Sequence, residues 1–95
     1  MKYGNRVDAN QEAIVKSLRK ACLSVAIIAP CGNGIPDLIV GWRGHNYLIE
    51  IKVGNAKLTP CEKTWHSEWK GSVAICKDAY DVFDHIASQE KKCSP

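Results

Sequence analysis

Three charged residues near the middle of the chain have the types and spacing that a metal-dependent phosphodiesterase needs. Asp37 follows Pro36, and twelve residues separate it from the segment Glu50-Ile51-Lys52. Two carboxylates can hold a divalent cation through hard oxygen ligands, and an ammonium group can lie beside the reacting phosphate. This chemistry requires that the three side chains meet in space.

A predicted β-hairpin would bring them together. Residues 37–40 and 47–52 have the apolar and β-branched content of two short strands, and the segment between them contains the glycines and asparagine typical of a hairpin loop. A turn centred near Gly44 places Asp37 opposite about residue 51. Because side chains alternate along a strand, the two charged residues of the second strand share one face and the isoleucines take the other.

The remaining segments predict helices and strands around this hairpin. Asp8 and Gln11 have the relation of a capping box, and Thr59, Pro60 and Glu62 form a second such start. In chain order we expect a helix from Asp8 to about Cys22, strands over 24–29, 37–40 and 47–52, a helix from Thr59 to Gly71, a strand over 72–76 and a helix after Asp78. The predicted order is αβββαβα, an α/β fold.

Composition limits the possibilities without deciding among them. The 95 residues predict a single domain over 1–95, with a core over about 6–88 and a frayed tail over 89–95, and 45% hydrophobic residues suffice for a core. A net charge of +3 is too mild to indicate a nucleic-acid partner by itself. No apolar run approaches the roughly 20 residues of a membrane span, and no signal peptide is evident, so we expect a cytoplasmic protein.

The five cysteines are odd in number and include no Cys-x-x-Cys pair, which indicates reduced thiols rather than a disulfide framework or a zinc site. We expect Cys22, Cys61 and Cys76 to fill the core.

The motif Gly34-x-Pro36-Asp37, the twelve-residue gap and Glu50-x-Lys52 resemble the PD-(D/E)XK nuclease superfamily. More narrowly, the chain resembles the VRR-NUC family in its small stand-alone form of phage and bacterial type. Residues 6–11 and the segment from Lys57 to Pro60, which leads to Trp65-His66, support the narrower resemblance. The four ordered stretches run from about residue 6 to about residue 83 and are more specific than the charged spacing alone. The resemblance implies a restriction-endonuclease-like domain, a mixed sheet flanked by helices.

The resemblance also implies a division of roles. Asp37 and Glu50 would hold one or two Mg²⁺ or Mn²⁺ ions, with the backbone carbonyl of Ile51 as a further ligand. The metal would lower the pKa of a bound water. Lys52 would orient or help to deprotonate that water and stabilise the transition state.

The first helix supplies a further candidate. The superfamily often contributes an acidic residue from this helix, and Gln11 shares the inward face with Ile14 and Leu18, whereas Glu12 falls one step round. We therefore favour Gln11 as a neutral participant, with a plain capping role as the alternative. For Glu12 a solvent-facing position is favoured over a metal ligand.

Five residues are candidate DNA contacts. Lys57 and Thr59 follow the active-site strand, where a lysine would contact the phosphate backbone without reading sequence. His66 has three possible partners: a phosphate, Glu50 or a structural hydrogen bond. Trp42 and Arg43 at the hairpin tip would stack on a distorted duplex, or an exposed tryptophan would mark a dimer contact.

Together these features predict a Mg²⁺- or Mn²⁺-dependent endodeoxyribonuclease in a bacterial or phage-infected cell. A chain of 95 residues has little room for a sequence-reading module, so we expect structure-selective cleavage. By analogy with Holliday-junction resolvases, the substrate would be a four-way junction and the active form a homodimer. Two alternatives stay open: a general nuclease module that takes its specificity from a partner, and a DNA-binding protein of the same fold that does not cleave.

Overall fold

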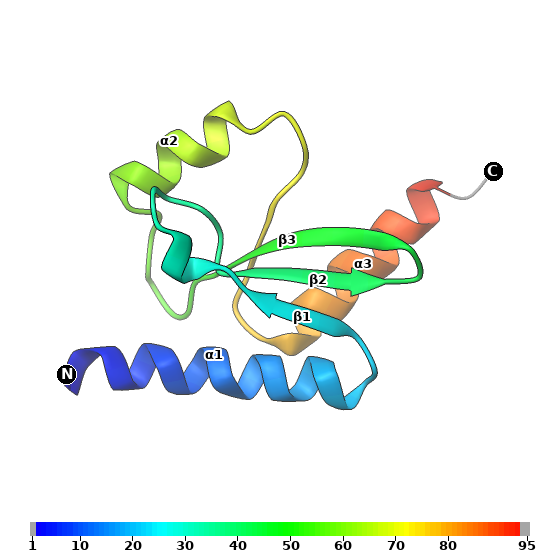
Figure 1. Cartoon of the computed structure of the whole chain (residues 1–95), viewed down its shortest axis with the longest axis horizontal. Coiled ribbons are helices and arrows are strands. Elements are labelled where there is room, and N and C mark those ends of the chain that lie inside the picture. Colours follow the sequence, from blue (N-terminus) through cyan, green and yellow to red (C-terminus); the bar gives the residue numbers. More distant parts are fainter. Residues whose placement is uncertain (1, 94–95) are drawn as a thin grey trace.

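The computed structural model describes the backbone of residues 2–93 and the side chains of residues 9–92 (Figure 1). In chain order its elements are α1 (Lys2–Lys20), β1 (Ser24–Ile27), the short 3-10 helix η1 (Ala29–Cys31), β2 (Leu38–Trp42), β3 (His45–Ile51), α2 (Pro60–Glu68), β4 (Ala74–Cys76) and α3 (Ala79–Cys93). Apart from η1, which lies in a predicted loop, this is the predicted order of helices and strands.

The four strands form one mixed sheet in the order β1-β2-β3-β4. Strands β1, β2 and β3 are antiparallel neighbours, whereas β4 runs parallel to β3. A parallel pair needs a long crossover connection, and the segment that contains α2 supplies it. The α/β class and the mixed sheet flanked by helices are therefore confirmed.

A two-residue turn sets the register of the β2–β3 hairpin. Trp42 pairs with His45, so the turn residues are Arg43 and Gly44, whose φ angles of 50° and 81° are both positive, as a type I′ turn requires. Because Leu38 pairs with Ile49, the position before it, Asp37, falls opposite Glu50. The predicted register was wrong by one residue, because the turn is centred between two residues and not on one.

The hydrophobic core lies between one face of the sheet and the helices α1 and α3. Alternating side chains of the hairpin are buried on this face, and they pack with buried residues of both helices (Leu38, Val40, Tyr47, Ile49, Ile51; Ile14, Val15, Leu18; Val82, Ile86). In Figure 1, α2 lies on the other side of the hairpin from α1. Side chains between the core positions of β3, such as Glu50, therefore point toward α2.

Helix α1 ends where predicted but begins earlier. Cys22 has a φ of 73°, its N–H bonds to the Arg19 carbonyl, and the N–H of Leu23 bonds to the Leu18 carbonyl. These bonds form a Schellman motif, in which two buried leucines pack across the helix end. The helix starts at Lys2, so Asp8 lies within it and the predicted cap was wrong; the Asp8 side chain lies outside the described part.

The capping residues predicted for the other two α-helices are confirmed. Thr59 caps α2, and its capping box with Glu62 is complete. Asp78 accepts a hydrogen bond of 2.9 Å from the N–H of Asp81 and so caps α3. Helix α2 ends at Glu68 and not at Gly71, because Trp69 already has an extended backbone.

Helix α3 continues to Cys93, so residues 89–93 of the predicted frayed tail are helical. The sequence there contains Gln, Glu and Lys, which are good helix formers.

Two of the three cysteines predicted to be core residues are exposed. Cys76 is buried, whereas Cys22 and Cys61 are exposed because one follows the end of α1 and the other lies in the first turn of α2. None of the helices within residues 2–93 is long and apolar enough to span a membrane.

Candidate active site

Two adjacent strand ends bring Asp37, Glu50 and Lys52 together. Asp37 lies directly before β2, Glu50 near the end of β3, and Lys52 directly after it. Asp37 Oδ2 accepts a hydrogen bond of 2.7 Å from the N–H of Ile51, which fixes its carboxylate against β3. Ile51 thus contacts Asp37 through its N–H; a ligand role for its carbonyl oxygen stays a prediction.

Glu50 is a charged side chain removed almost completely from water. Only 1% of it is exposed, and its Oε1 accepts no hydrogen bond from the described residues. The pKa of Glu50 is raised to about 8 by burial first, and then by a hydrogen bond with Asp37 and the negative charges of Asp37 and Glu62, while the positive charge of Lys52 opposes this rise. The positive charge of Lys52 is therefore too small to offset the burial of Glu50 and the negative charges beside it.

Lys52 is closer to Glu62 than to Glu50. Its Nζ lies 2.7 Å from Glu62 Oε1 and 3.9 Å from Glu50 Oε2. Both partners of the shorter contact are largely shielded, with 17% of each side chain exposed. Partial burial works to raise the pKa of Glu62, but hydrogen bonds from Lys52 and from the Thr59 N–H outweigh it, so the pKa lies below its ordinary value.

His66 of α2 lies next to Glu50. Its Nε2 is 3.6 Å from Glu50 Oε1, which is too long for a hydrogen bond, and neither buried atom has another partner among the described residues. The ring of Trp65 packs edge-on against the imidazole at 5.8 Å. The predicted proximity of His66 to Glu50 is thus observed, whereas a contact with phosphate stays a prediction. We call Asp37, Glu50, Lys52, Glu62 and His66 the strand-end cluster.

Glu62 was not predicted as a site residue. The sequence indicated it only as the closing residue of the α2 capping box, and it does accept the Thr59 N–H at 2.8 Å. The same Oε1 atom also contacts Lys52. No local pattern reveals that second contact, because it depends on where α2 packs against the end of β3.

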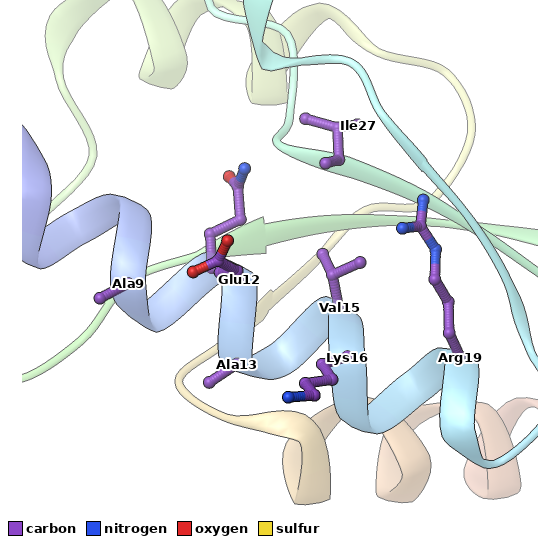
Figure 2. A pocket seen from close by; sticks show the side chains of 8 residues that line it. Ala9, Glu12, Ala13, Val15, Lys16, Arg19 and Ile27 are labelled. Carbon is purple, nitrogen blue, oxygen red and sulfur yellow. The ribbon is translucent and has the colours of Figure 1, made fainter.

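Gln11 and Glu12 lie at a separate groove. They belong to the lining of a cavity of about 910 Å³ between α1 and β1 (Ala9, Gln11, Glu12, Ala13, Val15, Lys16, Arg19, Ile27). Figure 2 shows Val15 and Arg19 projecting from α1 toward the strand that carries Ile27. Within the described residues neither Gln11 nor Glu12 makes a hydrogen bond or ion pair with the strand-end cluster. A role of Gln11 or Glu12 in the site therefore stays a prediction.

Trp42 and Arg43 lie at the opposite end of the hairpin from the cluster. Trp42 lies four positions along β2 from Leu38, or about 13 Å, and Arg43 follows it in the turn. Trp42 is half-buried and packs against the core, and the Arg43 guanidinium lies 5.1 Å from its ring centre and 3.7 Å from Glu90. The predicted exposed tryptophan was wrong, because the Trp42 side chain shares the core face with Leu38 and Val40.

Lys57 and Thr59 lie in the connection between β3 and α2, as predicted. Lys57 is exposed, and Thr59 uses its hydroxyl oxygen to accept the N–H of Glu62 at 3.2 Å. Their contact with DNA stays a prediction.

Across the described side chains, no three His, Cys, Asp or Glu residues form a group that could by itself hold a metal ion. Comparison of the chain with protein-family models, with curated proteins and with solved structures finds no match.

Proposed function

We propose that this protein is a divalent-metal-dependent endodeoxyribonuclease of the PD-(D/E)XK type, similar to the VRR-NUC family. The observation that carries the proposal is the position of Glu50. Its carboxylate is buried beside Asp37, its Oε1 receives no hydrogen bond from the described residues, and Lys52 lies 3.9 Å from its Oε2. Two neighbouring carboxylates and a lysine at adjacent strand ends match the chemistry that the sequence spacing predicts.

The residues fit a divalent cation. A buried carboxylate oxygen without a hydrogen bond is costly unless a positive charge accompanies it. Asp37 and Glu50 would hold Mg²⁺ or Mn²⁺, with the Ile51 carbonyl and waters as further ligands. The ion would supply charge neutralisation at the phosphate and a more acidic water.

Three side chains would supply the remaining functions of the site. Lys52 would orient the attacking water and stabilise the negative charge that develops on the phosphate. His66 lies against Glu50 and would hold that carboxylate in place. Lys57 is exposed in the next connection and would contact the DNA backbone.

The substrate we propose is branched DNA. The net charge of +3 provides a modest attraction to phosphates, which suits contacts with the DNA backbone that do not read sequence. A homodimer would place two sites symmetrically for paired cuts in a four-way junction, in the cytoplasm of a bacterial or phage-infected cell.

The test is cleavage of labelled four-way junction, splayed-arm and linear duplex DNA in Mg²⁺ or Mn²⁺, against EDTA and beside Lys52→Ala. We expect paired symmetric cuts in the junction, lost with EDTA and reduced by about a hundredfold or more in the variant. Cutting of every substrate would instead indicate a nuclease module that needs a partner for specificity.

Two observations favour a second candidate, a DNA-binding protein that does not cleave. Lys52 pairs with Glu62 at 2.7 Å, and no hydrogen bond or ion pair joins the first helix to the cluster in the described part of the chain. Binding of the junction without metal-dependent cleavage in the same experiment would support this candidate and contradict the nuclease.

A further inference from the structure

Glu62 connects the candidate lysine with the start of α2. Its Oε1 atom receives both the Lys52 ammonium at 2.7 Å and the Thr59 N–H at 2.8 Å. We propose that Glu62 is a positioning residue that holds Lys52 at a fixed place beside Asp37 and Glu50 and keeps it from closing on Glu50. The inference rests on the proposed function for its catalytic consequence, but the geometry it concerns exists without substrate.

The position of α2 depends on polar contacts near the cluster. None of its residues is fully buried, so apolar packing holds it weakly. Its described polar contacts with the sheet are Glu62 to Lys52 and His66 to Glu50. Gly34 adds a close approach, since a Cβ atom there would clash with the Cys61 carbonyl oxygen. Glu62 therefore lies where α2 contacts the end of β3, and its ion pair with Lys52 is one of the contacts between them.

Lys52 needs such a partner because its ammonium is carried on a flexible four-carbon stem. The nearest alternative acceptor is Glu50, whose Oε2 is already within 3.9 Å. Without Glu62, the ammonium would move onto Glu50 and compete with a cation for the same carboxylate. The ion pair with Glu62 thus keeps Lys52 close to the reaction centre and leaves Glu50 available.

The key variant is Glu62→Gln, which removes the charge but keeps an oxygen that can accept the Thr59 N–H. Glu68→Gln is the matched control, because it makes the same change at an exposed position of the same helix. Glu62→Asp keeps the charge on a shorter side chain and provides a second variant if Glu62→Gln folds poorly.

The first readout needs neither substrate nor metal. Side-chain NMR of Lys52 should show a more mobile ammonium end in Glu62→Gln and an intermediate one in Glu62→Asp, with Glu68→Gln like the parent. Equal Lys52 mobility in all four proteins would overturn the proposal, whether or not the protein is a nuclease.

Two further readouts concern the site. We expect Mn²⁺ affinity, measured by electron paramagnetic resonance, to fall by about fivefold to tenfold in Glu62→Gln, because the Lys52 ammonium would then pair with the Glu50 carboxylate. With junction DNA, kcat should fall by about tenfold or more while KM changes little, because a misplaced group costs mainly in the chemical step. An unchanged Mn²⁺ affinity in Glu62→Gln would contradict the competition between Lys52 and the cation. If the parent protein does not cleave at all, the proposed function fails, while the NMR result still decides the role of Glu62.

Discussion

Burial of Glu50 makes the stability of the metal-free protein depend on pH. The pKa of Glu50 is raised from 4.5 to about 8 in the folded state, chiefly by burial and by Asp37. Between these values the folded protein keeps a proton that the unfolded chain has lost. Unfolding therefore releases a proton, and this residue destabilises the fold progressively as the pH rises from about 4.5 to about 8.

Glu50→Gln should remove this penalty. We expect the variant to have a free energy of unfolding higher by roughly 4 to 5 kcal/mol at pH 8.5 without metal, and a much smaller difference near pH 4. Denaturant titrations at a series of pH values measure both. Glu68→Gln serves as the control and should follow the parent; a Glu50→Gln curve parallel to the parent's would rule out the buried charge as the cause.

Spacing predicted the residues that come together, but not how each one is used. Asp37, Glu50 and Lys52 could be placed because a short hairpin leaves few registers, and even so the register was wrong by one residue. Glu62 was missed because its sequence context identifies a helix cap and gives no sign of a lysine from another element. Long-range contacts between side chains depend on packing that local patterns do not encode.

At the scale of elements, the end of α1 contains a residue with a strained backbone, and a substitution there should relieve the strain. Cys22 adopts a φ of 73° at the position where a Schellman motif favours glycine. Cys22→Gly should raise the free energy of unfolding by about 1 kcal/mol, because the side chain there is exposed and its loss removes strain without removing packing. Thermal and denaturant unfolding check this. Cys22→Ala keeps a Cβ atom and should show no gain, so an equal gain in both variants would point to the thiol and not to the backbone.

The loop before β2 has a stricter requirement at Gly34 than at Gly32. Both glycines have positive φ angles, 81° and 75°, but only at Gly34 would a Cβ atom meet another segment, the α2 backbone at Cys61. Gly34→Ala should therefore destabilise the protein by about 3 kcal/mol or displace α2, whereas Gly32→Ala should cost only about 1 kcal/mol. The difference between the two variants in denaturant unfolding isolates the close approach, and equal costs would contradict it.

Helix starts were predicted better than helix ends. Thr59, Glu62 and Asp78 carry capping information in their own side chains, so the starts of α2 and α3 could be predicted from a few residues. The start of α1 was placed six residues too late, because Asp8 is a plausible cap whose signal is overridden by a longer helix. Trp69 ends α2 through its backbone conformation, which no residue type in that segment requires.

For the whole molecule, the two sides of the sheet differ in how firmly they are covered. The α1 and α3 side contains the buried hydrophobic core, whereas α2 on the other side has no fully buried residue. Amide hydrogens of α2 should therefore exchange by local opening, at least about a hundredfold faster than those of Val40 and Ile49 in the hairpin. Hydrogen exchange measured residue by residue tests this, and equal protection in both regions would mean that α2 opens only with the whole fold.

The order of the α-helices and strands over residues 2–93 could be predicted, but their three-dimensional arrangement required the structure. Apolar and β-branched patterns indicated the strands, and the caps indicated two of the helices. The parallel pairing of β3 with β4, and hence the place of α2 above the strand-end cluster, follows from the path of the crossover connection.

The first strand has one further consequence, for the behaviour of the protein at high concentration. β1 lies at the edge of the sheet, and the guanidinium of Arg19 donates a hydrogen bond of 2.9 Å to its Val25 carbonyl. An edge strand with free backbone groups invites pairing with another chain, and a bulky cation there obstructs it. Arg19→Ala should consequently promote concentration-dependent aggregation, seen by light scattering, while Lys20→Ala on the same turn should not. Such a result would mean that Arg19 limits aggregation by obstructing the pairing of β1 with another chain.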